Sequence, residues 1–212
     1  TGLELSLGYG HTWNNNFRWD SNFTLSHNKN KIKELVRDYV HPETGELINK
    51  DRLDVGGLGK ARFILKEGGT LGDLYTQSDL KRDDNGMVDI DPTGIVAIEN
   101  NLPDIKLGSV FPKANLAWSN HFSWKGISLS ALFTARIGGI VYSATEAAMD
   151  QYGVSERSAL ARDNGGVLVN NRTLVDAQNY YTTIGSESGL PQYYTYNATN
   201  VRLQEASIGY LI

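Results

Sequence analysis

Two pairs of alternating stretches, each pair joined by a very short turn, constrain this chain more than any other feature of its sequence. Between residues 17 and 28 the odd positions are mostly apolar, whereas the even positions carry charged, amide or hydroxyl groups. Successive side chains of a β-strand point to opposite faces, so such a segment lies between an apolar and an aqueous medium. That apolar medium is either a packed protein core or the hydrocarbon of a lipid bilayer.

The same alternation predicts five strands, with tight turns between the first and second and between the third and fourth. Asn residues and Gly126 suit these turns because they tolerate the positive φ angles of tight reversals. In the last stretch the apolar positions change parity after Leu203, which predicts a β-bulge near Gln204 and Glu205. The expected strands cover residues 2–11, 17–28, 116–124, 127–136 and 200–212.

Two long polar connections separate these strands, at about residues 29–113 and 137–199. Both are rich in Gly, Asp, Asn, Thr and Tyr, and loops this long inside a compact domain are normally functional. Short extended pieces, such as residues 61–66, are expected to add local strands within them. The fold class is therefore all-β with long loops on one side of an antiparallel sheet.

Three features favour a bilayer over the core of a β-sandwich, which remains the alternative. The expected strands are longer than usual and suit a tilted membrane crossing of about 9–11 residues. Tight turns at one end and long connections at the other are typical of outer-membrane barrels. Aromatic residues are expected near strand ends, as in an interfacial girdle: Tyr9, Trp13, Trp19, Trp118, Trp124 and Tyr210.

These features predict an antiparallel transmembrane β-barrel segment in which one strand face contacts lipid. Leu5, Phe23, Trp118 and Leu129 are expected on that face. An open five-stranded sheet would leave the backbone groups of its edges unpaired in lipid, at several kcal/mol each. The chain is therefore expected to be part of a larger barrel.

Composition excludes several classes of function. With 20 basic and 24 acidic residues among 212, and no dense basic block, we expect no nucleic-acid partner. The absence of cysteine excludes disulfides and thiolate metal sites. A mean hydropathy of −0.36 does not exclude a barrel, because only every second strand residue faces lipid. The start at Thr1, without a methionine or an apolar leader, suggests a mature protein or a fragment.

No arrangement of residues predicts catalysis, a cofactor or a metal ion, so we expect no enzyme. The four histidines, His11, His27, His41 and His121, are too far apart in sequence for metal-ligand spacing. Residues 81–92 resemble a calcium loop, but Lys81 and Pro92 replace its terminal ligands, which favours an acidic turn. Residues 56–60 lack the flanking residues of a phosphate loop and are expected to form a flexible turn. Residues 185–189 place Glu187 where a nucleophile elbow needs serine.

A tyrosine-rich group in the second connection offers either sugar-binding faces or packing surface. Packing of the connection onto its neighbours is the favoured interpretation, so substrate-binding residues remain unknown. The group consists of Tyr180, Tyr181, Tyr193, Tyr194 and Tyr196.

An ordered series of segments resembles the C-terminal part of the SusC/RagA-like TonB-dependent outer-membrane transporters of Bacteroidetes. The series spans essentially the whole chain in the order that the family shows. It comprises TGLELSLGY (1–9), SHNKNKIKEL (26–35), KEGGTLGDLY (66–75), DDNGMVDID (83–91), NHFSWKGISLSALF (120–133), GGIVYS (138–143) and NVRLQEASIGYLI (200–212).

The resemblance implies a 22-stranded barrel in the bacterial outer membrane, closed by an N-terminal plug. It also implies a SusD-like surface lipoprotein as partner, import of oligosaccharides or peptides, and energy from TonB acting through the N-terminal part. Residues 1–212 would then be the C-terminal part of the barrel with long extracellular loops, the plug domain and closing strands being absent from this sequence. The alternative is a secreted all-β glycan-binding module or a surface adhesin.

Overall fold

The computed structural model describes residues 1–211, which are mainly β-strand in antiparallel sheets. The described residues form two compact units. One, the sheet unit, contains residues 1–30, 111–140 and those from 197 onward. The other, the connection unit, contains residues 31–110 and 141–196. The two long connections thus fold together and separately from the sheet.

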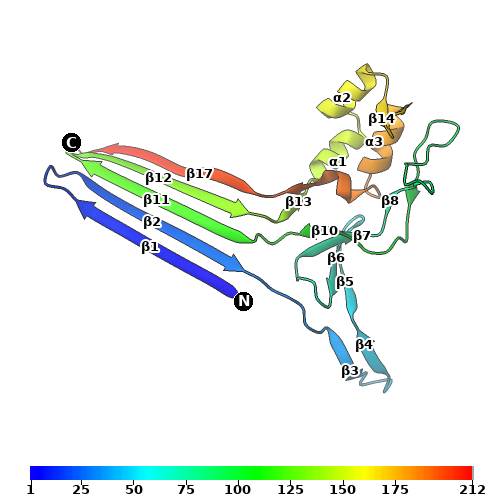
Figure 1. Cartoon of the computed structure of the whole chain (residues 1–212), viewed down its shortest axis with the longest axis horizontal. Coiled ribbons are helices and arrows are strands. Elements are labelled where there is room, and N and C mark those ends of the chain that lie inside the picture. The colour runs from blue at the N-terminus through cyan, green and yellow to red at the C-terminus, as the bar shows by residue number, and fades with distance from the viewer. Residues whose placement is uncertain (212) are drawn as a thin grey trace. The chain divides into compact units, whose positions relative to one another are not determined.

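The sheet unit is one antiparallel sheet of five strands, each 11 residues long. Its strand order is β1-β2-β11-β12-β17, with β1 and β17 at the edges (Figure 1). All five predicted strands are confirmed, although Ile212, which was expected to end the last one, lies outside the described residues. The strands are β1 (Gly2–Thr12), β2 (Arg18–Asn28), β11 (Ala114–Trp124), β12 (Ile127–Ile137) and β17 (Asn200–Tyr210).

The predicted turns and bulge are also confirmed. Asn16 has a φ of 62° in the first turn, and Gly126 has a φ of 87° in the second. Lys125 adopts a positive φ of 47° as well, which the sequence does not indicate. On β17, Leu203 pairs with Phe133 and Glu205 pairs with Leu132, so Gln204 is the extra residue of the bulge. The bulge restores the alternation of faces along β17.

The connection unit contains most of the remaining strands and all the helices of the described residues. A four-stranded antiparallel sheet has the order β10-β7-β6-β5, and the predicted strand at residues 61–66 is its β6. The first connection contains β3 (Val36–Val40), β4 (Leu47–Lys50), β5 (Arg52–Leu58), β6 (Ala61–Lys66), β7 (Asp73–Thr76), β8 (Asp79–Leu80), β9 (Ile98–Glu99) and β10 (Ile105–Ser109). The second contains β13 (Ile140–Tyr142), α1 (Ala144–Gln151), α2 (Glu156–Asp163), β14 (Val167–Val169), β15 (Thr173–Val175), α3 (Ala177–Gly185), the 3-10 helix η1 (Pro191–Tyr194) and β16 (Thr195–Asn197).

The three α-helices begin at side chains that cap their first turns. Ser143, Ser155 and Asp176 each accept a hydrogen bond from the backbone N–H three residues later. Ser143 and Glu146 match the serine-to-glutamate spacing of a capping box, so the sequence itself carries a signal for the start of this helix. No helix within residues 1–211 is both long enough and apolar enough to span a membrane.

A shared hydrophobic core joins the two connections. Leu80 and Val96 come from the first connection, and they belong to one buried cluster with Val175, Ile184 and Tyr194 from the second. Hydrogen bonds also link the connections: the Gln192 amide donates to the Ser78 carbonyl at 3.0 Å. The expectation of long loops therefore needs correction, since these segments form a folded unit with its own core.

Candidate functional site

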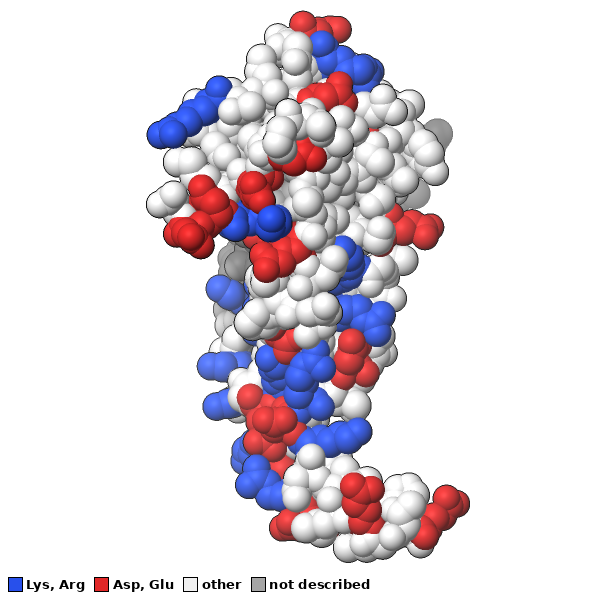
Figure 2. Space-filling view, turned by 90° about the vertical axis from the view of Figure 1, so that its right-hand side faces the viewer, with Lys and Arg blue, Asp and Glu red and all other residues white. Residues whose placement is uncertain are grey.

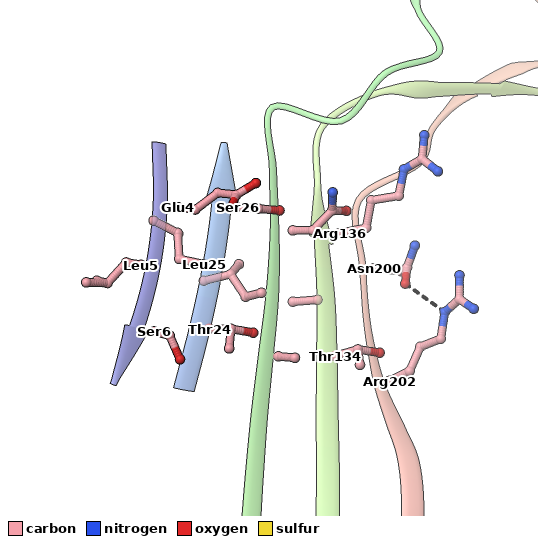
Figure 3. Close-up of a pocket in the computed structure, with 14 residues that line it drawn as sticks. Glu4, Leu5, Ser6, Thr24, Leu25, Ser26, Thr134, Arg136, Asn200 and Arg202 are labelled. Atoms are coloured by element: carbon pink, nitrogen blue, oxygen red, sulfur yellow. Dashed lines mark hydrogen bonds between the residues drawn. The ribbon is translucent and has the colours of Figure 1, made fainter. Parts of the chain in front are cut away.

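The polar face of the sheet carries the main candidate site. The register aligns Ser6, Thr24, Ala117, Thr134 and Arg202 in one row across the five strands. The next row consists of Glu4, Ser26, Asn115, Arg136 and Asn200. Both rows line a hollow of about 650 Å³. Figure 3 shows Glu4 and Ser6 on the opposite side of β1 from Leu5, as strand alternation requires.

Charge is unevenly distributed around this hollow. Arg136 and Arg202 lie on the neighbouring strands β12 and β17, and Figure 3 shows both guanidinium groups on the same side of the sheet. Arg202 Nε donates a hydrogen bond to Asn200 Oδ1 at 2.8 Å. Glu4, the acidic residue of the lining, lies on the far edge strand β1. The hollow is thus basic at its β12–β17 side.

The other end of the polar face, near the tight turns, is internally paired. Arg18 and Asp20 form an ion pair at 2.6 Å, and Nδ1 of His121 is hydrogen-bonded to Ser130 Oγ at 2.7 Å. Gly10 faces Asp20 across the β1–β2 pair, and a Cβ at Gly10 would lie 2.7 Å from the Asp20 carboxylate. The glycine therefore makes room for that carboxylate on this face.

The opposite face of the sheet is apolar and has no second layer within the described part of the sheet unit. Leu5 is 43% exposed, Trp118 46% and Leu129 48%. In one row the register aligns Leu7, Phe23, Trp118, Phe133 and Leu203. The four residues expected on one face, namely Leu5, Phe23, Trp118 and Leu129, do share it. A contiguous apolar surface of this kind needs an apolar neighbour.

An aromatic belt crosses the apolar face near the tight turns. Its members have ring centroids 4.5 to 6.5 Å from their neighbours: Tyr9, His11, Trp13, Phe17, Trp19 and Phe122. The indole N–H of Trp19 donates to the Asn120 side chain at 3.1 Å, so this polar group is satisfied on an apolar face. Trp118 was expected near a strand end, but it is the fifth of the 11 residues of β11 and stacks on Phe133 instead.

Both edges of the sheet lack a partner strand within the described residues. The sheet ends at β1 on one side and at β17 on the other, and both are full-length strands. One side of each therefore presents a row of backbone N–H and C=O groups. Such groups pair with water, or with another strand if the sheet lies in an apolar medium.

The tyrosine-rich group packs the connection unit, as the favoured interpretation predicted. Tyr194 is 0% exposed and Tyr181 is buried beside it in the core. Burial raises the pKa of Tyr193 to about 12, with smaller contributions from the nearby Tyr180 and Asp79. These side chains are therefore structural, although Tyr196 is exposed.

A buried polar cluster joins α1, α2 and η1 in this unit. The Asp150 carboxylate accepts hydrogen bonds from Tyr194 Oη at 2.9 Å and from Ser155 Oγ, and it pairs with Arg157. Burial, followed by the Asp150 hydrogen bond, raises the pKa of Tyr194. Burial alone would lower the pKa of Arg157, but the hydrogen bond and charge of Asp150 outweigh it and raise that pKa. Each member has a partner, which fits a role in holding the three elements together.

A second charged cluster fixes the sheet of the connection unit. Arg52 of β5 makes two hydrogen bonds to Asp104, at 2.8 and 2.9 Å, and Lys66 of β6 lies 2.5 Å from the same carboxylate. The Arg52 hydrogen bond and then the Lys66 contact outweigh burial and lower the pKa of Asp104 to about 2. Elsewhere on this unit, Figure 2 shows basic and acidic side chains intermixed, without a continuous basic surface.

The motif look-alikes have local structural roles. Asp83 accepts hydrogen bonds from the backbone of Asn85 and Met87, both at 2.9 Å, so the predicted acidic turn is confirmed. Asp91 caps a second such turn by accepting from Thr93 and Ile95. The expected turn at residues 56–60 needs correction: Gly56, Gly57 and Leu58 belong to β5, and only Gly59 and Lys60 form the turn.

The histidines do not form a cluster. Among residues 1–211 no group of three or more His, Cys, Asp or Glu side chains is arranged to hold a metal ion. His27 Nδ1 is hydrogen-bonded to the Lys113 carbonyl, and His41 Nδ1 accepts from the backbone of Glu43 and Thr44 in the β3–β4 turn. His11 belongs to the aromatic belt.

Comparison of the sequence with models of protein families and with curated proteins finds no match. The functional assignment therefore depends on the geometry and chemistry of the chain itself. The hollow around Arg136 and Arg202 was missed from the sequence, because these residues meet only through the pairing of strands that are about 65 residues apart. The signal that the sequence did offer for this site is one arginine at a polar-face position in each of the two strands, Arg136 in β12 and Arg202 in β17.

Proposed function

We propose that the chain is the C-terminal part of a SusC/RagA-like TonB-dependent transporter, with its sheet forming part of a barrel wall in the bacterial outer membrane. The apolar face of the sheet carries this proposal. Large side chains on it are exposed on β1, β11, β12 and β17, up to 80% for Ile208, and those of β2 are half-buried. Hydrocarbon is the medium that would solvate this face while water solvates the other.

The strand geometry supports the same assignment. Strands of 11 residues match the length of a tilted membrane crossing, about 9–11 residues. The aromatic belt lies at one end of the apolar face, where a barrel wall meets the interface. Closing the unpaired edges of β1 and β17 by further strands would satisfy their backbone groups in lipid. Together these features favour a segment of a 22-stranded barrel over an isolated sheet.

In this proposal the polar face lines the path of an imported oligosaccharide or peptide. The connection unit would lie among the extracellular loops, where a SusD-like lipoprotein would deliver the substrate. TonB would supply energy through a plug domain outside this sequence. Transport of this kind requires binding and release, and it involves no covalent chemistry by the residues of this chain.

Lipid-phase quenching tests the proposal directly. The chain lacks cysteine, so single-cysteine variants at Phe133 and Thr134 can each carry one fluorophore. These neighbours point to opposite faces of β12, because their cross-strand partners belong to the apolar and polar rows respectively. After reconstitution from the outer-membrane fraction, spin-labelled lipid should quench the probe at position 133, and aqueous iodide the probe at position 134.

Two outcomes would contradict the proposal. Equal quenching of both probes by lipid would show that neither face is selectively solvated by hydrocarbon. A chain that is monodisperse and monomeric in plain buffer would instead favour the secreted glycan-binding module or adhesin, in which another protein surface covers the apolar face.

A further inference from the structure

We infer that the apolar face binds an anionic phospholipid at the tight-turn end of β11, β12 and β17, where Lys125 contacts the phosphate of the headgroup. This inference rests on the proposed function, since it names a lipid partner of the surface that would face the bilayer. The headgroup end of the site consists of Lys125, Trp124 and Tyr210.

The ammonium group of Lys125 lies at the rim of the apolar face. Trp124 follows Phe122 of the aromatic belt by two residues, so both side chains are on this face. Lys125 Nζ lies 4.9 Å from the centroid of the Trp124 ring, a distance typical of a cation–π contact. The contact directs the ammonium group toward the apolar side of the turn. A lysine in this position can bind a phosphate group as a point charge.

Two amphipathic rings flank the same turn. Tyr210 is directly opposite Ile127, and a Cβ at Gly126 would lie 3.6 Å from Cε2 of the Tyr210 ring. Trp124 and Tyr210 are both exposed. Tryptophan and tyrosine favour the headgroup level of a bilayer because each combines an apolar ring with one polar group. The three side chains therefore suit the level at which the phosphate of a lipid joins its apolar part.

Charge complementarity favours an anionic lipid at this turn. Within residues 1–211 the acidic side chains of the sheet unit are Glu4, Asp20 and Glu205. The register places all three in the rows of the polar face. On the apolar side, a phosphate beside Lys125 would therefore meet a cation and none of these carboxylates.

A series of apolar pairs between β12 and β17 continues from this turn along the sheet and offers a path for an acyl chain. The alanine pair has the shortest side chains of the series, which leaves room for an alkyl chain between the larger pairs on either side. In order from the turn, the pairs are Ile127–Tyr210, Leu129–Ile208, Ala131–Ala206 and Phe133–Leu203.

Lipid-selective quenching of the fluorophore at position 133 tests the inference. An acyl chain that lies over the Ala131–Ala206 pair reaches this position, which belongs to the next pair of the series. Spin-labelled phosphatidylglycerol and spin-labelled phosphatidylcholine are compared as minor components of phosphatidylcholine vesicles. We expect about fivefold stronger local association of phosphatidylglycerol, the contribution of one lysine near an anionic headgroup. This preference should weaken as the salt concentration rises.

Substitutions of Lys125 assign the preference to this turn. Lys125→Gln should remove the preference, whereas Lys125→Arg should retain it because the charge is kept. Arg18→Gln is the matched control: it removes the same charge near the same end of the sheet, but on the polar face, where Arg18 pairs with Asp20. The preference should be unchanged in this control. Circular dichroism verifies that each variant is folded.

Equal association of the two lipids, or an unchanged preference in folded Lys125→Gln, would overturn the inference. Equal losses in Lys125→Gln and Arg18→Gln would also overturn it, because general attraction to the basic chain would then explain the preference. If inorganic phosphate abolishes the preference at constant ionic strength, the site binds free phosphate and the assignment to a lipid fails.

The same probe separates this inference from the transporter proposal. Equal quenching by the two spin-labelled lipids would contradict the inference and leave the proposed membrane-facing sheet intact. Quenching by neither lipid would contradict both.

Discussion

The two units of the chain differ in whether they bury apolar side chains. In the described part of the sheet unit no apolar residue is buried, and large ones such as Trp118 and Leu129 point outward from a single layer. The connection unit has an interior in which Ile64, Leu190 and Tyr194 are almost completely buried, although other apolar residues, such as Leu58 and Leu168, are exposed on its surface. Alternation along a strand therefore defines which residues share a face, but not what medium covers that face.

The units also differ in what stabilises them. The strands of the sheet unit pair along ladders of 9 to 11 residue pairs, so much of its order is backbone pairing. The connection unit depends on a core and on buried charges that join segments far apart in sequence. Substitutions inside that core should therefore destabilise one unit and leave the other unchanged.

Removing the buried carboxylate of the connection unit should have the largest effect. Asp150→Ala leaves Arg157 without its main partner and the Tyr194 hydroxyl without its acceptor. Breaking a buried ion pair from one side costs about 3–5 kcal/mol. Hydrogen exchange should show faster opening of α1, α2 and η1 with unchanged protection in β11 and β12. Asp163→Ala, at the exposed end of α2, is the control, and equal effects of the two substitutions would contradict the role of Asp150.

A charged side chain introduced on the apolar face should have the next largest effect. Its cost in the free energy of unfolding should depend on its depth in the bilayer. Phe133 is at mid-strand, whereas Leu129 is the third residue of β12 and aligns with the aromatic belt. Phe133→Arg should cost about 2–4 kcal/mol in lipid, and Leu129→Arg about 0–1 kcal/mol. Urea unfolding in liposomes measures both.

Leu132→Arg is the matched control for this depth series. Leu132 lies on the polar face, opposite Glu205, so an arginine there gains a partner of opposite charge. We expect near-wild-type stability for this variant. Equal destabilisation by Leu132→Arg and Phe133→Arg would mean that both faces of the sheet lie in the same medium. The apolar face of the sheet unit would then not differ in its surroundings from the polar face, which would contradict the contrast drawn between the two units.

The Asp104 cluster predicts a pH dependence that is confined to the connection unit. The pKa of Asp104, about 2, is below the ordinary value of 3.8, so the ionised carboxylate stabilises the fold above about pH 4. This contribution is lost as the pH falls through about 2. Asp104→Asn should lower the free energy of unfolding by about 2 kcal/mol at pH 7. The variant should then lose less further stability than the wild type between pH 4 and pH 2. Asp84→Asn, in an exposed turn, is the control and should change neither the stability at pH 7 nor its loss in acid. An unchanged acid transition in Asp104→Asn would show that Asp104 does not cause the pH dependence.

The sheet could be predicted from the sequence because its information is local. Strand positions follow from alternation, the turns from Asn16 and Gly126, and the bulge from the change of parity around Gln204. The connection unit could not be predicted in the same way. The Asn170 side chain pairs with the backbone of Val88, 82 residues away, and no local pattern specifies that contact. The helix starting after Ser143 did carry a local signal in its capping box.

The candidate site shows the same limit. The polar face as a whole follows from alternation, but the meeting of Arg136 and Arg202 depends on the register of β12 against β17. That register is fixed by the bulge together with the match of apolar rows, which acts over the whole sheet. The sequence therefore predicted the surface of the site and not its charged pair.

Deleting Gln204 should have the smallest effect and tests whether alternation alone specifies the sheet. Without the bulged residue, Leu203, Glu205 and Ala206 alternate regularly, so every side chain of β17 keeps its face. We expect a loss below about 1 kcal/mol, since bulges bend a strand but add no ladder hydrogen bond. Deleting Ala131 from the middle of β12 is the control: it reverses the faces on one side of the deletion and should prevent correct pairing. Urea unfolding compares the two, and failure to fold without Gln204 would show that the bend itself is required.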